Sequence, residues 1–317
     1  MKLNCTVTGT TGIISVQITG SHSAQTATAQ VEAIATTLDI GSYIEIYLGY
    51  VGDTALVFTG YVKSVEIKEP TKTYYLTCAD VLVKAMDYFI ASNNPDAPFK
   101  RKNIKAENLV RDVLALANIT NYTGDNTLFT FGINNDVEVN LTSSYDYSRF
   151  IADILAYILY ADLTGKVHFT RRLPYIVGGD VPVGTLTIAD ATSMSYSKTD
   201  KDLRNRVVVY GAEGIFAEAK ATSPYLPAGF YKTVVVAAPT VFDNTNMAQQ
   251  SADYNLALLN KLTYNCNATI IGNPHLQPRT AITVVNQSLG ISGNWYVFGV
   301  THSFTSAGYT TGLDLRR

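Results

Sequence analysis

The residues most suited to chemistry in this chain are its four histidines. Histidine titrates near neutral pH, which makes it the usual general base and a common metal ligand. His22, His168, His275 and His302 lie far apart in the sequence, and no HExxH or HxH pattern joins any two of them. Their spacing therefore predicts no metal site, and each is expected to pack in the core or to lie at the surface.

His275 has the most unusual neighbours. It lies in the stretch GNPHLQPRTAITVV, residues 272–285, between Pro274 and Pro278. Each proline fixes its own φ, lacks an N–H donor and keeps the residue before it out of the helical region. The stretch is therefore predicted to be a stiff, extended corner that joins a helix to the last strands. We interpret Pro274, His275 and Pro278 as a structural corner in which the imidazole bonds to nearby backbone, and not as a catalytic site.

Other catalytic patterns are absent or weak. The chain has no GxSxG elbow, no Walker-type loop and no dinucleotide fingerprint. Cys5, Cys78 and Cys266 are widely spaced and odd in number, so they predict neither a disulfide framework nor a zinc site. Two carboxylates across a cleft would suffice for glycoside cleavage, but the densest acidic stretch, KTDKD at 198–202, reads as a charged turn. We predict no catalytic residue, no cofactor and no metal.

Composition favours a β-rich protein with an unusual surface. Charged residues make up 16% of the chain, well below the usual quarter, whereas tyrosine is abundant at 21 residues. Permanent protein interfaces are rich in tyrosine and poor in lysine and glutamate. A strand-rich protein shows a similar bias without any partner, so both explanations stay open.

Charge and hydropathy limit the partners. The net charge of −2 provides no basic excess for nucleic acid, and the cationic stretch FKRKNIK at 99–105 is expected to be a solvated loop. The longest apolar run, residues 150–163, carries Asp153 and Asp162 and is too short to cross a bilayer. No membrane insertion is therefore predicted. The opening MKLNCTVTGTTG lacks the apolar run of a signal peptide, so the reducing cytosol is the expected compartment.

Hydrophobic periodicity predicts a mainly β fold with an α+β insertion. Residues 1–92 read as alternating strands and predict a first β-barrel, which strands within 186–215 could complete. Residues 93–175 carry two amphipathic helices and a hairpin. Residues 176–317 return to strands, with one helix at 246–262, and predict a second barrel. The two outer segments echo each other as a duplicated barrel would, although their identity is too low to establish a repeat.

Several stretches, in order along the chain, resemble the late-control-D-like family of hub proteins, which lie at the base of phage tails and of related contractile injection systems. The clearest are the corner with its following strand, 272–287, and GNWYVFGVTHSFTSAGYTTGLDL at 293–315, which matches a Y-V-x-x-V-x-H-x-F strand, a glycine turn and a last strand. VFTGYVKSVEI resembles the family's Phe-x-Gly-x-Val strand. The remaining matches are SYDYSRFIADILAYILYADLTGKVHF at 144–169 and LRNRVVVYGAEG at 203–214.

The resemblance implies a structural, non-enzymatic role in the virion, after assembly in the bacterial host cytoplasm. It implies a homotrimer in which each subunit supplies two barrels similar to the tail-tube subunit, next to a small helical domain. Such a trimer adapts the six-fold tail tube to a three-fold central spike. Its other expected partners are the tape measure protein and the baseplate wedge proteins, and DNA would pass through its channel without sequence readout.

Two alternatives from other functional classes remain. The dispersed acidic residues leave open a tail-associated peptidoglycan hydrolase. The abundance of tyrosine and asparagine leaves open a carbohydrate-binding β-module. The chain lacks any evident lysozyme insertion, peptidoglycan-binding module or β-helical spike, which implies that a separate spike protein caps the hub.

Overall fold

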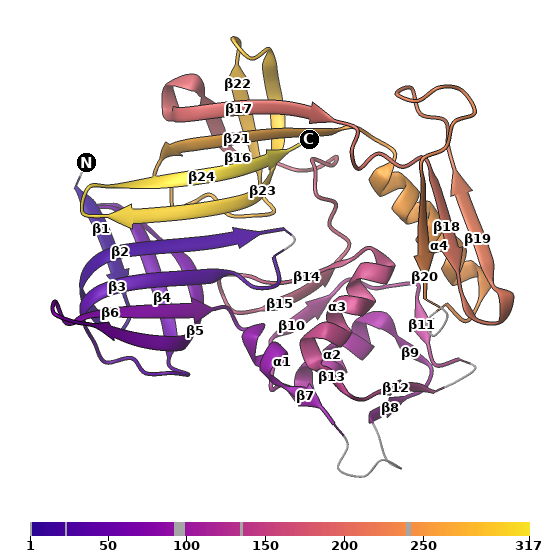
Figure 1. Cartoon of the computed structure of the whole chain (residues 1–317), viewed down its shortest axis with the longest axis horizontal. Coiled ribbons are helices and arrows are strands. Elements are labelled where there is room, and N and C mark those ends of the chain that lie inside the picture. Colours follow the sequence, from indigo (N-terminus) through magenta and orange to yellow (C-terminus); the bar gives the residue numbers. More distant parts are fainter. Residues whose placement is uncertain (1, 23, 92–98, 134–135, 239–241) are drawn as a thin grey trace.

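The computed structural model describes residues 2–22, 24–91, 99–133, 136–238 and 242–317. The protein is mainly β, as predicted, and a twelve-stranded sheet is its largest element. Figure 1 shows that strands from both ends of the chain build this sheet, with a helical unit beside it and a smaller sheet at the far side.

Six strands of the large sheet come from the N-terminal part and six from the C-terminal part. The N-terminal strands are β1 (Leu3–Val7), β2 (Thr10–Ser21), β3 (Thr28–Thr36), β4 (Tyr43–Tyr50), β5 (Asp53–Lys68) and β6 (Thr73–Ala79). The C-terminal strands are β16 (Pro182–Thr187), β17 (Ala191–Thr199), β21 (Thr263–Ile271), β22 (Ala281–Asn286), β23 (Ile291–Thr305) and β24 (Gly308–Arg316). We call these two sets the N-half and the C-half.

The two halves have the same topology. Numbered by chain order within each half, the strands follow one spatial order: first, fourth, fifth, sixth, third, second. Thus β5 is the counterpart of β23, and β2 is the counterpart of β17. The pairing differs in one place, because β1 is antiparallel to β4 whereas β16 is parallel to β22. Neither half closes on itself as a ring of paired strands within the described residues.

Irregularities in the strands repeat as well. The β5–β6 register shifts between Val62 and Ser64, and the β23–β24 register shifts between Val297 and Gly299. Both bulges lie inside a shared Y-V-x-x-V pattern, YVKSV at 61–65 and YVFGV at 296–300. A bulge bends and twists a strand at a fixed point. The shared position shows that the halves are structural repeats, which the low sequence identity alone could not establish.

Strand alternation explains how each half buries its core. In β4, Ile44, Ile46 and Leu48 are fully buried on one face, while Tyr43 on the other face is exposed. This is the alternation predicted from the sequence. Each half has its own apolar cluster, one under the N-half strands and one around Trp295 of the C-half.

The helical unit lies between the halves in the chain. Its helices are α1 (Val83–Asp87), α2 (Ala106–Leu116) and α3 (Ser144–Leu155), and its main sheet contains β10 (Tyr122–Gly124), β14 (Ile158–Ala161) and β15 (Val167–Thr170). Three short two-stranded ladders complete it: β7 (Phe89–Ile90) with β13 (Thr142–Ser143), β8 (Phe99–Arg101) with β12 (Val137–Val139), and β9 (Ile104–Lys105) with β11 (Thr130–Phe131). The side chain that caps α3 belongs to Ser143, which accepts a hydrogen bond from the Asp146 N–H.

A second small sheet packs on the helical unit. It contains β18 (Arg206–Tyr210), β19 (Phe216–Lys220) and β20 (Thr233–Ala237), and the helix α4 (Thr245–Leu259) covers one of its faces. Its inner side chains share one apolar cluster with α2 and α3. The division of the chain into three domains stays a prediction, and its first boundary, at 92/93, lies outside the described residues.

Candidate functional site

The corner predicted around His275 lies where the C-half, the N-half and the helical unit meet. The chain enters the corner from strand β21, and not from a helix as expected, turns through residues 272–280 and enters β22. Nε2 of His275 lies 2.8 Å from Oδ1 of Asp53, at the start of β5. The imidazole therefore pairs with a carboxylate of the other half, and the expected bond to nearby backbone is wrong. Both side chains are about 60% exposed, at 59% and 61%, so the pair lies at the surface.

Arg279 forms the inner part of the same corner. Its backbone has φ 72°, a left-handed conformation that is unfavourable for any residue with a Cβ. Its N–H donates to Val297 O at 2.7 Å, and Nη1 donates to Ser21 O at 3.0 Å. The guanidinium carbon lies 3.9 Å from the centre of the Tyr160 ring. One residue thus joins three elements: its backbone bonds to β23, and its side chain reaches the end of β2 and the hairpin of the helical unit.

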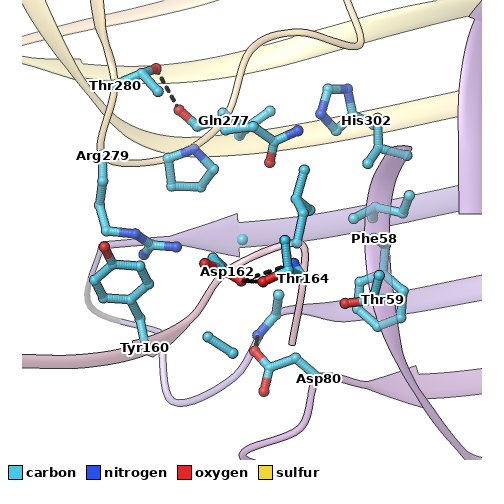
Figure 2. Close-up of a pocket in the computed structure, with 18 residues that line it drawn as sticks. Phe58, Thr59, Asp80, Tyr160, Asp162, Thr164, Gln277, Arg279, Thr280 and His302 are labelled. Atoms are coloured by element: carbon cyan, nitrogen blue, oxygen red, sulfur yellow. Dashed lines mark hydrogen bonds between the residues drawn. The ribbon is translucent and has the colours of Figure 1, made fainter. Parts of the chain in front are cut away.

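A cavity of about 410 Å³ lies behind Arg279 (Figure 2). Its walls come from β2, β5, β23, the corner and the turn after β14, and most of them are apolar. Its polar groups are few: Asp80, Asp162, Gln277, Arg279 and His302 are the main ones. A largely apolar cavity with a few convergent polar groups is the usual form of a binding site, which makes it the candidate to test for chemistry.

Asp80 is the deepest carboxylate in this cavity, at 5% exposed. Its oxygens accept the N–H groups of Ala27, at 2.6 Å, and Leu82, at 2.9 Å. Burial raises the pKa of Asp80, and these hydrogen bonds oppose the shift. Both oxygens are engaged with backbone, so the side chain fixes the start of α1 rather than presenting a free base.

Two further histidines are buried and paired with tyrosine. Nδ1 of His22 lies 2.7 Å from the Tyr296 hydroxyl, and Nδ1 of His302 lies 2.8 Å from the Tyr309 hydroxyl. Burial lowers the pKa of His22 to about 3 and that of His302 to about 4. Both imidazoles are therefore neutral at pH 7 and serve as packing and hydrogen-bonding groups.

His168 is the fourth histidine, and it is half-buried on the hairpin of the helical unit. Its Nε2 lies 2.7 Å from Oδ2 of Asp162, and its ring stacks on Tyr160 with the centroids 4.8 Å apart. Tyr160 thus lies between His168 and Arg279. This contact fixes the ring over which the guanidinium stacks.

The three cysteine thiols are chemically quiet. Burial raises the pKa of Cys5 and Cys78 to about 12 and that of Cys266 to about 11, which keeps all three as thiols. Among the described residues, no three His, Cys, Asp or Glu side chains come close enough to hold a metal ion. Within the same residues, no helix is both long enough and apolar enough to cross a membrane.

The open face of the large sheet is the second candidate, and it is polar without being charged. Two neighbouring rows of six residues each run across the sheet, and together they span the eight strands from β5 to β17. Their members are exposed or half-exposed. One row is Thr28, Thr19, Thr301, Gly312, Thr269 and Ser193. The other is Ser64, Thr77, Gln30, Gln17, Ser303 and Thr310.

Charge lies only at the margins of these two rows. Glu32 and Glu66 lie next to the rows on one side. Asp314 lies next to them on the other side, with Nη2 of Arg316 3.6 Å from its Oδ2. A surface of hydroxyl and amide groups without lysine or arginine offers phosphate groups no ion pairs. The rows themselves contain no apolar side chain, and the second row ends next to Ile271, which is 64% exposed. A polypeptide or a nucleic acid could therefore touch this face without binding to it tightly.

Sequence reasoning found the corner but missed its main side chain. Pro274, His275 and Pro278 drew attention because of residue type. Arg279, which makes the contacts, is an ordinary arginine in the sequence. The available signal was the repeat, because LDIGSY at 38–43 takes the same place as LQPRTA at 276–281, and Gly41 has φ 84° where Arg279 has 72°.

The sequence matches no family model and no curated protein. Solved structures, in contrast, match over nearly the whole chain. The tail protein from Neisseria meningitidis MC58 has a TM-score of 0.72 at 14% identity, covering 99% of this chain and 96% of that one. The prophage MuSo2 43 kDa tail protein from Shewanella oneidensis has a TM-score of 0.70 at 13% identity, covering 99% and 97%.

A secretion protein has the same fold. The E. coli structure is a component of the type VI secretion system, described as structurally similar to the bacteriophage T4 tail proteins gp27 and gp5. Its TM-score is 0.61 at 8% identity, and the match covers 98% of this chain and 76% of that one. At such identities the likeness establishes a shared fold with tail proteins.

Proposed function

We propose that this chain is the hub of a phage tail baseplate, a homotrimer that joins the six-fold tail tube to a three-fold central spike. The observation that supports this most strongly is the full-length match in fold to two tail proteins, with TM-scores of 0.72 and 0.70. The role is structural and non-enzymatic. The virion is its place of action.

The repeated halves supply a reason for the symmetry. Each six-stranded half is the counterpart of one tube-subunit barrel, so three chains present six similar units to a six-fold tube. The helical unit and the small sheet occur once per chain and therefore keep three-fold symmetry. A protein with two repeats per chain is thus suited to adapt one symmetry to the other.

The uncharged face of the large sheet suits the wall of the channel. The tape measure protein and then DNA would move past its hydroxyl and amide rows, which hold neither phosphates nor apolar side chains tightly. The tube protein, spike protein and baseplate wedge proteins would contact other surfaces. Exposed apolar side chains such as Val181 (80%) and Leu128 (80%) are available for such contacts.

The test is the solution mass, followed by a binding assay. Light scattering behind a sizing column is expected to give three times 34.5 kDa, or about 104 kDa. The purified trimer should then cap tail tubes, which electron microscopy of tube ends would show. A monomer that binds neither tube nor spike, or that clears peptidoglycan in a zymogram, would refute the hub and favour the alternatives.

A further inference from the structure

One edge of the large sheet has no partner strand, and the repeat indicates what belongs there. β17 is the last strand of the sheet and pairs only with β21 among the described residues. Its counterpart β2 is the last strand of the N-half, yet β2 pairs with β23 of the C-half. The strand equivalent to β23 is β5. The partner that the repeat assigns to β17 is therefore β5.

The matching part of β5 also lacks a partner strand along one edge. β4 pairs with β5 only over 53–61, whereas β6 pairs with its other edge over 61–68. Among the residues that the structure describes, 64–68 therefore have one edge without a partner, which lies on the side of β4. In the C-half, the corresponding part of β23 is the segment 299–305, which β2 occupies.

The free edges are at opposite ends of the sheet. Figure 1 shows the strands stacked in order from β17 through β24, β23 and β2 to β5. A chain cannot bring its own β17 to its own β5 across this distance without dismantling the sheet. We infer that β17 of one copy pairs antiparallel with residues 64–68 of β5 in the next copy, in the register of the β2–β23 seam.

Equivalent bulges define that register. The shift in β17 lies between Ala191 and Ser193, and that in β2 between Ile13 and Ser15, so Ser193 is the counterpart of Ser15. The shift in β23 makes Gly299 the counterpart of Ser64. Transferring the β2–β23 pairs by these equivalences gives the pairs between copies: Thr199 with Ser64, Ser197 with Glu66, and Tyr196 with Ile67.

Exposure supports this assignment independently of topology. Ile67 is 56% exposed and Tyr196 is 36% exposed, so both present apolar surface that a partner strand could cover. Their counterparts in the seam within the chain, His302 and Ile18, are 2% and 3% exposed. Pairing between copies would cover Ile67 and Tyr196 in the same way.

The interface is head-to-tail, because two different edges meet, and such contacts either close into a ring or form an open filament. This inference rests on the proposed hub function only for the closure at three copies. The pairing itself rests on the repeat. The two can therefore fail separately.

Disulfide trapping tests the register. Ser197→Cys combined with Glu66→Cys is expected to give covalent trimers, with little ladder beyond three, when the full chain is oxidised and run on a non-reducing gel. Ser193→Cys with Glu66→Cys uses the same strands four residues out of register and should stay unlinked. Thr19→Cys with Thr301→Cys is the matched pair within one chain and should link without a change of mass.

A charge at the seam tests association without cross-linking. Ile67→Asp is expected to weaken assembly at least tenfold while the melting of the separated chain stays unchanged, since Ile67 is already exposed. Leu128→Asp, at an 80% exposed position of the helical unit, is the control and should assemble normally.

The outcomes separate the two proposals. A 104 kDa species that neither traps the in-register pair nor responds to Ile67→Asp overturns this seam and leaves the hub standing. Monomers at every concentration, with no trapping, also overturn the seam. Trapped rings that bind neither tube nor spike support the seam and remove the hub.

Discussion

The two halves of the large sheet contain the same corner with different residues in it. In the N-half, Gly41 donates its N–H to Val62 O, and in the C-half Arg279 donates to Val297 O. Both residues have a positive φ. Glycine adopts this conformation freely, whereas a Cβ makes it unfavourable by roughly 1–2 kcal/mol. The C-half therefore retains a strained residue where the N-half has none.

The surroundings explain the difference. A Cβ on Gly41 would meet nothing within 4 Å, so the first corner faces open space. The Arg279 side chain instead reaches Ser21 and stacks on Tyr160. The comparison teaches that the repeat fixes the backbone path, while the elements packed around each copy select the side chain. Tyr160 of the helical unit lies against the residue at the C-half position, and the arginine is found there.

The largest effect is expected where the halves differ most in volume. Trp295, 1% exposed, fills the C-half core, and its counterpart in β5 is Gly60. Trp295→Ala should lower the free energy of unfolding by about 3–5 kcal/mol. Gly60→Ala should cost about 1–3 kcal/mol, because the new Cβ would lie 2.2 Å from Ala79 O. Urea unfolding measures both.

Gly299→Ala is the control for these two variants. Its Cβ would make only ordinary contacts, at 3.5 Å from the Asp314 and Ser21 side chains. It should cost less than about 1 kcal/mol. A loss as large as that of Trp295→Ala would show that the bulge, and not the core volume, limits stability.

The second prediction exchanges the corner residues. Arg279→Ala removes the bond to Ser21 O and the stacking on Tyr160, and should cost about 3 kcal/mol. Arg279→Gly restores the residue type of the N-half, and should be about 1 kcal/mol less harmful because the left-handed backbone is relieved. Thermal unfolding measures the difference. Equal losses in the two variants would mean that the corner relaxes when the side chain is removed.

Gly41→Ala is the matched change in the N-half. It adds a Cβ to the same left-handed conformation without removing any contact, so it isolates the backbone contribution. We expect a cost of about 1 kcal/mol. No cost at all would contradict the assignment of strain to Arg279.

The third prediction concerns the pH dependence of stability. It distinguishes the β2–β23 pairing within the chain from the junction with the helical unit. His302 lies in β23, and His22 bonds to Tyr296 next to the helical unit. Both folded-state pKa values, about 4 and about 3, lie below the ordinary 6.5. Below pH 6.5 the unfolded chain therefore binds protons that the folded protein does not. Stability is complete above this pH and falls as the pH decreases, by about 1.4 kcal/mol per pH unit for each histidine.

Replacing each histidine isolates its share, because buried carboxyls such as Asp80, whose pKa is raised, act in the opposite direction. His302→Gln should flatten the stability curve between pH 6.5 and about 4. His22→Gln should flatten the stability curve over a wider range, from pH 6.5 down to about pH 3. Unchanged slopes in both variants would show that the imidazoles are already solvated in the folded protein.

Strand patterns were sufficient to predict the mainly β class. The insertion domain and the structural corner of Pro274, His275 and Pro278 stay predictions. The alternation of Ile44, Ile46 and Leu48 needs only a period of two, and Pro274 and Pro278 restrict the backbone locally. The repeat was visible only as YV-x-x-V, because two cores of different composition leave few identical residues. Only its counterpart Gly41 points to Arg279, since neither the left-handed backbone of Arg279 nor its contact with Tyr160, far away in sequence, is encoded in its neighbours.

The smallest effect is expected at His275, the residue that first drew attention. Its contact with Asp53 joins two side chains that are both about 60% exposed, at 59% and 61%, and pairs of this kind contribute roughly 0–1 kcal/mol. His275→Gln keeps a hydrogen-bond donor and should change the unfolding free energy by less than about 0.5 kcal/mol, and Asp53→Asn should behave alike. A double-mutant cycle of the two measures the coupling. A coupling much larger than this would make the outer side of the corner as important as Arg279, and the stiffness that the two prolines impose would no longer suffice to explain how the corner holds the halves together.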